Sequence, residues 1–165
     1  MSRLVKALKL AFQKMESRRW DTVYIFVDMH ETVVEPTWSK ELATTLYPKA
    51  EPTLQMMSAH PNVKLILWSS SLPETNLEYQ KFFLQKGIRF SAINSNPFEG
   101  STVYADFDTK PYMSLILDDK AGFQPSDWEE LHDYFVMMKA LNLLKAMSDG
   151  ASASETGAVN TFLDD

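Results

Sequence analysis

A run of five β-branched or aromatic residues, Val23–Val27, constrains the fold more than any other feature of the chain. This composition is typical of a strand buried on both faces at the centre of a parallel sheet. The run stops at Asp28, and His30, Glu31 and Thr32 follow within the next four positions. Because open α/β sheets bind ligands beyond the carboxyl ends of their strands, these polar residues form a candidate site.

Strands and helices alternate along the rest of the chain. Apolar runs predict three further strands, at 63–68, 89–93 and 112–117. Capping residues and helical spacing of apolar residues predict helices at 40–46, 52–60, 73–86 and 127–147. Such alternation is typical of an α/β fold with a mostly parallel sheet. The connections leave room for a short excursion after the first strand, but not for a substantial cap domain.

The 165 residues fit one domain with one sizeable core, flanked by two segments of distinct composition. Residues 1–20 carry a charge of +5, and since the whole chain carries −6, the remainder carries −11. Residues 1–20 are predicted to form a basic amphipathic helix that packs over the sheet or on a partner. Contact of this helix with anionic lipid or a phosphate backbone is the alternative. Residues 21–147 form the predicted domain, and the Ser-, Ala- and Gly-rich residues 148–165 are predicted to be disordered.

Composition excludes several classes of site. The absence of cysteine excludes disulfides, thiolate nucleophiles and cysteine-ligated zinc, and it suits a reducing, cytoplasmic location. The three histidines lack the i, i+4 spacing of a helical zinc site. No apolar run approaches the length of about 20 residues that a membrane span needs. The acidic body argues against nucleic-acid binding over the whole surface, although a nucleic-acid end remains open as a substrate.

Three predicted strands end in polar residues that a parallel sheet would bring to one edge. They end at Asp28, at Ser69 and at Asp118-Asp119, and Lys110 lies just before the last strand. Three carboxylates without cysteine favour a hard cation with oxygen ligands, for which Mg²⁺ is the best match. A serine hydroxyl and a lysine ammonium at the same edge supply donors for phosphate oxygens. The sequence therefore predicts a magnesium site that handles a phosphoryl group.

In this order, and at these strand ends, the motifs resemble those of the haloacid dehalogenase (HAD) superfamily of phosphohydrolases. The family has an Asp-x-Asp-x-Thr motif, then a Ser or Thr, a Lys and an acidic pair, which the residues above match in turn at all but one position. The tract 110–123 also resembles a small capless subgroup of the family. The resemblance covers residues 23–123 and implies a Rossmann-like, three-layer α/β sandwich without a substantial cap.

The resemblance implies a role for each matching residue. Asp28 would attack phosphorus and form an aspartyl phosphate. Ser69, with Ser70 beside it, would bind phosphoryl oxygens, and Lys110 would neutralise charge on the nucleophile and the phosphoryl group. Trp38 lies in the excursion that forms a flap over the site in this family, so it is the candidate for substrate contact.

The same resemblance implies the metal ligands and exposes one departure. Asp28, Asp118 and Asp119 would hold Mg²⁺ together with the backbone carbonyl of His30, and Thr32 would hold the loop geometry. The family has a second Asp in place of His30, and its carboxyl protonates the leaving group and then activates water. An imidazole can act as an acid and a base, but beside Mg²⁺ its protonated form is disfavoured.

Two functions remain open on the sequence. The first is a Mg²⁺-dependent phosphatase that acts through an aspartyl phosphate on Asp28. The second is a catalytically impaired relative that binds a phosphorylated ligand or a protein. Without a cap the site is open, which suits a bulky phosphorylated substrate or a cover supplied by a second copy or another protein. We favour the enzyme because all the motif residues except the second Asp are present.

Overall fold

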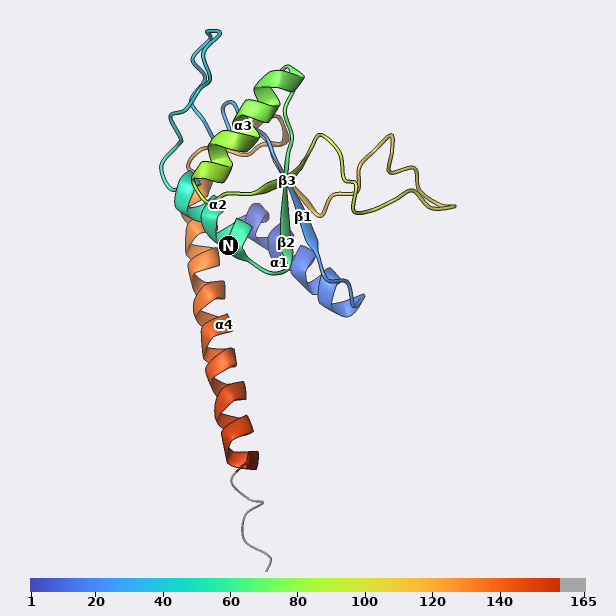
Figure 1. Ribbon diagram of the computed structural model, residues 1–165, viewed down its shortest axis with the longest axis vertical. Helices are drawn as coiled ribbons and strands as arrows, with labels where there is room; N and C mark the ends of the chain where they lie inside the picture. The colour runs from blue at the N-terminus through green and yellow to red at the C-terminus, as the bar shows by residue number, and fades with distance from the viewer. Residues whose placement is uncertain (158–165) are drawn as a thin grey trace, which may run out of the picture.

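A four-stranded parallel sheet forms the centre of the computed structural model, which describes residues 1–157 of the chain (Figure 1). The strands lie in the order β3-β2-β1-β4. Their bounds are β1 (Val23–Val27), β2 (Val63–Leu67), β3 (Phe90–Ile93) and β4 (Leu115–Leu117). The run that the sequence placed at the centre of the sheet is β1, and it is buried along its whole length.

The register of the sheet aligns the carboxyl ends of three strands. Val27 at the end of β1 pairs with Leu67 at the end of β2 on one side and with Leu117 at the end of β4 on the other. Because the strands are parallel and in register, whatever follows each of them begins at one edge. The sheet thus brings together side chains that are far apart in the sequence.

Helices flank the sheet, which confirms the predicted α/β, Rossmann-like fold. They are α1 (Arg3–Ser17), α2 (Ala50–Ala59), α3 (Pro73–Gln85), α4 (Asp127–Gly157) and the 3₁₀ turn η1 (Asp119–Ala121). Side chains of α1, α2, α3 and α4 pack into one large core with the sheet face that carries Val23, Ile25 and Val27. This core excludes water from one whole side of the sheet.

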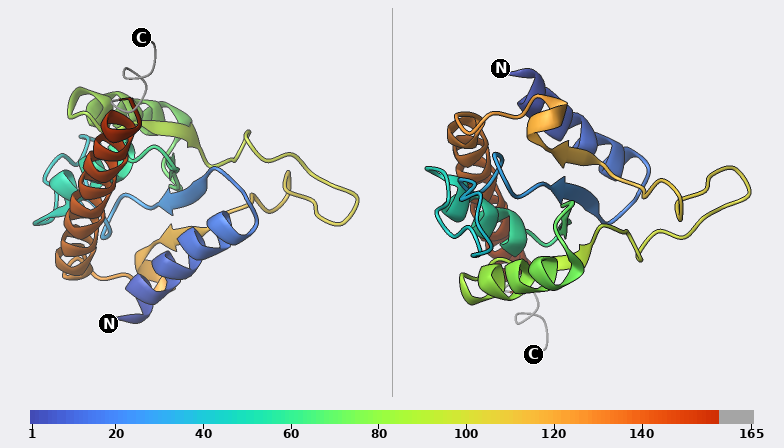
Figure 2. Two further views of the ribbon diagram at one scale, coloured as in Figure 1. Left: turned by 90° about the horizontal axis from the view of Figure 1, so that it is seen from below. Right: turned by 90° about the horizontal axis from the view of Figure 1, so that it is seen from above.

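The opposite face of the sheet has a smaller core around Tyr24, Phe26 and Ile66. The third layer on this side is the connection between β3 and β4, residues 94–114, which contains no helix. Figure 2 shows that part of this connection extends away from the sheet as a long loop. No element of the described chain forms a cap domain, as the sequence predicted.

The predicted helix at 40–46 is wrong. Residues 38–41 instead form a bend, and residues 42–46 run back alongside the segment that follows β1, where Leu46 pairs with Val34. The backbone N–H of Glu35 donates to the carbonyl of Thr45 and that of Tyr47 to the carbonyl of Val33, both at 2.9 Å. These bonds between two segments of the same chain pair backbone groups that a helix would have paired within itself.

The N-terminal helix packs over the body of the protein, as expected. In α1 the buried side chains lie on one face, and they are Val5, Leu8, Ala11, Phe12 and Met15. Ser2 caps the helix by accepting a hydrogen bond from the N–H of Val5, and its own N–H donates to Glu130 of α4. The apolar stripe is therefore covered within the chain itself, so it needs no partner.

The C-terminal helix is longer than predicted. α4 continues past residue 147 to Gly157, so 148–157 are helical rather than disordered, while 158–165 lie outside the described residues. Extending an existing helix adds one hydrogen bond per residue without the cost of a new nucleus, and no proline interrupts this segment. Among the described residues, neither α4 nor any other helix is long and apolar enough to cross a membrane.

Two leucines of α1 test this packing. Leu8 is fully buried and Leu10 is 54% exposed. We expect Leu8→Ala to lower the free energy of unfolding by about 2–5 kcal/mol through lost burial and an unfilled cavity. The matched Leu10→Ala change should stay within about 0.5 kcal/mol of wild type. Urea unfolding followed by circular dichroism measures both, and equal losses would contradict the placement of α1.

Candidate functional site at the carboxyl edge of the sheet

A pocket of about 500 Å³ lies where β1, β2 and β4 end. It gathers residues from four segments of the chain, and these are Asp28, His30, Glu31, Trp68, Ser69, Ser70, Asn94, Asp118, Asp119 and Lys120. Six of them were predicted as site residues from the sequence. The structure therefore brings together the acidic, serine and histidine positions that lie up to 91 residues apart.

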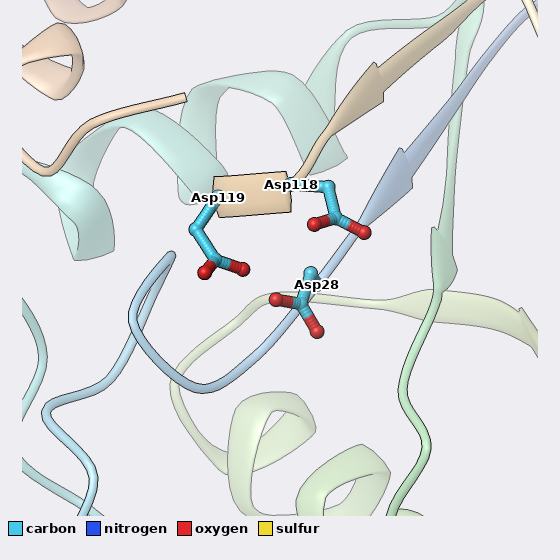
Figure 3. A group of neighbouring side chains, drawn as sticks. All are labelled: Asp28, Asp118 and Asp119. Carbon is cyan, nitrogen blue, oxygen red and sulfur yellow. The ribbon is translucent and has the colours of Figure 1, made fainter. Parts of the chain in front are cut away.

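Three carboxylates converge at the floor of this pocket. Oxygen atoms of Asp28, Asp118 and Asp119 all lie within 4.8 Å of one another. Figure 3 shows Asp28 just beyond β1 and the other two beside each other beyond β4, with their carboxylates turned toward a common space. The backbone N–H of Asp28 donates to the carbonyl of Leu117 at 2.9 Å, which ties the two strand ends together.

Thr32 joins two members of this acidic group to each other and to α4. Its hydroxyl donates to Oδ2 of Asp28 at 3.2 Å and accepts from the backbone N–H of Asp119 at 3.1 Å. Its carbonyl accepts from the indole N–H of Trp128 at 2.7 Å, which anchors the loop to the first turn of α4. Thr32 is fully buried, so these bonds form without competition from water.

The electrostatics of the group centre on Asp28. Burial, together with repulsion from Asp118 and Asp119, raises the pKa of its carboxyl from 3.8 to about 6. Hydrogen bonds from the backbone and from Thr32 oppose this shift but do not cancel it. The negative charges of the three carboxylates are thus not fully compensated, and a divalent cation would compensate them.

Lys120 is the cation that the structure places beside the carboxylates. Its ammonium group hydrogen-bonds to Asp119 and lies 3.8 Å from Glu31. The bond to Lys120 holds the pKa of the Asp119 carboxyl below its usual value, and the same bond raises the pKa of the lysine. The sequence analysis missed this residue, although its position two residues beyond Asp118 was the signal that could have found it.

Lys110, which was predicted to act at this edge, is not among the residues that line the pocket, so its role stays a prediction. A residue that precedes a parallel strand lies toward the opposite, amino edge of the sheet. Ser114, just before β4, is bonded there to Tyr24 near the start of β1: its N–H donates to the Tyr24 carbonyl at 2.9 Å and its hydroxyl accepts from the Tyr24 N–H at 3.0 Å. Lys110 itself is exposed in the preceding loop.

Ser69 is held by two asparagines. Asn94, which directly follows β3, accepts from the N–H of Ser69 at 2.8 Å and donates to its carbonyl at 2.7 Å. Asn76 of α3 donates to the carbonyls of Ser69 and Ser71, at 3.5 and 3.1 Å, and the Ser69 hydroxyl accepts from the Ser71 N–H. The hydroxyl hydrogen of Ser69 remains available to the pocket. Asn94 was missed from the sequence, although a polar residue directly after a strand was again the signal.

Asn94 has a left-handed backbone, with φ of 51°. Asparagine is one of the few residues other than glycine that adopts this conformation at low cost. The turn directs its side-chain amide back toward the end of β2, where both bonds to Ser69 form. The left-handed backbone and the two bonds to Ser69 thus both depend on an asparagine at position 94.

His30 lines the pocket, and one of its ring nitrogens is hydrogen-bonded. The hydroxyl of Tyr79 lies 3.0 Å from Nε2 of His30, and the two rings pack edge to face with centroids 5.7 Å apart. Tyr79 belongs to α3 and is fully buried, which raises the pKa of its hydroxyl. The imidazole is therefore fixed in orientation by a residue that the sequence analysis did not single out.

Trp38 does not line the pocket, so its predicted contact with substrate stays a prediction. Its side chain is 87% exposed, in the excursion between β1 and α2. The excursion is anchored at its base, where Ala43 is buried and Leu42 and Leu46 pack against the core. The aromatic side chain at the mouth of the pocket is instead Trp68, which packs edge to face on Phe26.

Comparisons with known proteins bear on the fold and not on the chemistry. No protein-family model matches the chain, and no curated protein matches it. The chain is similar to the solved structure of a conserved protein from Bacteroides thetaiotaomicron, with 25% identity and a TM-score of 0.51. The match covers 72% of this chain and 91% of that one. The description of that protein states no activity, so the similarity supports the α/β fold alone.

The raised pKa of Asp28 predicts a pH-dependent effect of Asp28→Asn in metal-free buffer. The folded state disfavours the ionised carboxylate, so the cost to stability grows as the pH rises from about 4 and is complete above about 6. Asparagine keeps the shape without the charge. We expect the variant to gain about 1–2 kcal/mol over wild type at pH 7.5, after allowance for solvent screening, and to lose that gain near pH 4.

Thermal unfolding in the presence of a chelator, recorded between pH 4 and pH 8, measures this difference. The matched control is Asp108→Asn, which removes an exposed carboxylate from the loop before β4. A gain from Asp28→Asn that did not depend on pH would contradict the electrostatic origin of the effect.

Proposed function

We propose that this protein is a Mg²⁺-dependent phosphohydrolase of the HAD type, in which Asp28 is the nucleophile. One observation carries the proposal: Asp28, Asp118, Asp119 and Ser69 line a single pocket at the carboxyl edge of a parallel sheet. The resemblance of the sequence motifs to that superfamily supports the same chemistry. Although Lys110 lies outside the pocket, Lys120 supplies a cation within it.

The donor set at the pocket floor fits magnesium. All three groups are carboxylates, and hard divalent cations prefer oxygen ligands over nitrogen or sulfur. The mutual repulsion that raises the pKa of Asp28 is the kind of uncompensated charge that such a cation relieves. When bound, Mg²⁺ would neutralise charge on the phosphoryl oxygens and keep Asp28 ionised.

In the proposed reaction, a carboxylate oxygen of Asp28 attacks phosphorus. An O–P bond to the enzyme forms while the bond to the leaving oxygen breaks, and the leaving oxygen takes up a proton from the His30 imidazole. Water then attacks the aspartyl phosphate, which releases inorganic phosphate and restores the carboxylate. Ser69 would donate its hydroxyl hydrogen to a phosphoryl oxygen, and Lys120 would offset negative charge beside Asp119.

The substrate class follows from the uncovered pocket. No cap domain lies over it, and the excursion that carries Trp38 contributes to the lining only through His30 and Glu31 near its base. We propose a bulky phosphorylated substrate whose reactive phosphate reaches the pocket while the remainder stays outside, since a small metabolite would need a lid to exclude water. A second copy or another protein that covers the site is the alternative.

A second candidate function rests on His30. In the family an acid and base group stands at this position, whereas Nε2 of His30 is bonded to Tyr79. If that bond persists during turnover, proton transfer must use the other ring nitrogen or fail. The protein would then be a module that binds a phosphorylated ligand or protein and turns it over slowly or not at all.

A phosphatase screen with Mg²⁺ tests the first function. Wild type should release phosphate, Asp28→Asn should be inactive, and Lys120→Met should be slower than the matched Lys110→Met variant. We expect a loss of roughly 10²-fold for Lys120→Met, the low end for removing one preorganised charge contact. Mg²⁺ should raise the melting temperature of wild type by mass action, and Asp118→Ala should abolish that rise.

Each result discriminates between the two functions. Activity that persists in Asp28→Asn would show that another residue is the nucleophile. A magnesium response without phosphate release from any phosphomonoester would favour the binding module. Equal losses in Lys120→Met and Lys110→Met would contradict the assignment of Lys120 to the pocket.

His30→Ala separates chemistry from ligand binding. A substrate with a poor leaving group needs an acid, so loss of the imidazole should slow its turnover by roughly 10²–10⁴-fold. A nitrophenyl phosphate leaves without a proton, so the step that forms the aspartyl phosphate should lose much less. Single-turnover kinetics on both substrates measure this ratio. Unchanged rates on both would mean that His30 contributes its backbone alone.

A further inference from the structure

The outer face of α4 carries an apolar seam in the half of the helix that projects from the body (Figure 1). We define the outer seam as the four residues Met137, Ala140, Leu144 and Met147. All four are exposed, from 46% for Met137 to 71% for Met147. Three further exposed apolar residues flank it, Val136, Leu141 and Leu143. Exposed apolar surface of this extent on a soluble domain marks a contact site.

The spacing of the outer seam is that of a helix-pairing surface. Its members are three, four and three residues apart, which is the a/d pattern of a coiled coil. The part of α4 that lies against the body uses a different seam of the same spacing, Trp128, Leu131 and Phe135, and these side chains are buried. One seam of the helix is therefore already packed, and the second is rotated away from it toward solvent.

The outer seam is symmetric about Asn142. Position 137 mirrors 147, and position 140 mirrors 144, so reversing the direction of the helix reproduces the same layers. Two antiparallel copies would place methionine against methionine and Ala140 against Leu144, a small side chain against a large one. Self-complementarity of this kind is what a two-fold interface requires.

Charge favours a second copy over a lipid surface. No charged residue belongs to the outer seam or its flanks, so two helices meet without burying a charge. Glu129 and Asp133 continue the same face toward the body, and the chain carries −6 overall. An anionic membrane would repel both. Antiparallel pairing also sets the two helix dipoles in opposite directions.

We propose that two copies of this protein associate through the outer seams of α4, antiparallel, with the two-fold axis at the level of residue 142 along the helix. The contact is short compared with a standard interface of about 800 Å² per partner, so the dimer belongs to the weak, concentration-dependent class. A groove of about 570 Å³ lies between α2 and α4, and Leu143, which flanks the outer seam, lines this groove. The proposal does not depend on the chemistry of Asp28.

Disulfide trapping tests both the contact and its direction, because the chain has no cysteine of its own. In the antiparallel pairing, residue 137 of one copy faces residue 147 of the other. Two 137 positions would be ten residues apart along the axis, about 15 Å, beyond the roughly 7 Å that a disulfide spans. A mixture of full-length Met137→Cys and Met147→Cys should therefore cross-link as a mixed dimer, while neither variant alone should.

Sedimentation supplies an independent measurement. Leu144→Glu should weaken self-association by roughly 30-fold or more, as expected for a central contact residue. The matched control is Leu84→Glu, which changes an exposed leucine on α3 and should leave association unchanged. Circular dichroism confirms that both variants remain folded.

Three results would overturn the proposal. One is a wild-type chain that stays monomeric at all accessible concentrations. Another is homodimeric cross-linking of Met137→Cys or Met147→Cys alone, which a parallel pairing would give. The third is a monomer that binds vesicles of phosphatidylcholine and phosphatidylglycerol and loses that binding in Leu144→Glu, which would assign the seam to lipid.

Discussion

The site depends on one buried hydroxyl. Thr32 donates to Asp28 and accepts from the backbone of Asp119, so a single side chain fixes the distance between the loops after β1 and β4. Its carbonyl is in turn held by Trp128, which ties the same point to α4. In a site where three carboxylates repel one another, such neutral bonds stabilise an arrangement that the charges oppose.

The parallel register supplies the other constraint. Val27, Leu67 and Leu117 are neighbours across the sheet, so the residues that follow them start at one edge whatever their separation in sequence. The same rule explains why one lysine lines the pocket and the other does not. Lys120 follows β4 and reaches the pocket, whereas Lys110 precedes β4 and lies toward the other edge. Chain direction decides which of the two can contact a ligand.

Asymmetry between the two faces of the sheet leaves the pocket uncovered. Helices pack on one face, and the other carries a connection without a helix. The excursion after β1 folds back on itself as an extended segment, and Trp38 points into solvent. The pocket therefore lies open at the carboxyl edge of the sheet, and under the proposed function most of a bulky substrate would lie outside it.

The sequence by itself determined the order of strands and helices, the buried central strand, and six of the pocket residues. It could do so because periodicity and the abrupt end of an apolar run are local signals. Only the tertiary structure decided that Asn94 bonds to Ser69, that Tyr79 bonds to His30, and that Lys120 lines the pocket while Lys110 does not. A local pattern marks Asn94 and Lys120 as polar residues just beyond strands, but the partner of each side chain, 25 residues away for Asn94 and 49 for Tyr79, is a matter of the tertiary fold. The predicted helix at 40–46 failed for the same reason, because bonds from Val33 and Glu35 to a distant segment outweighed its local helical signals.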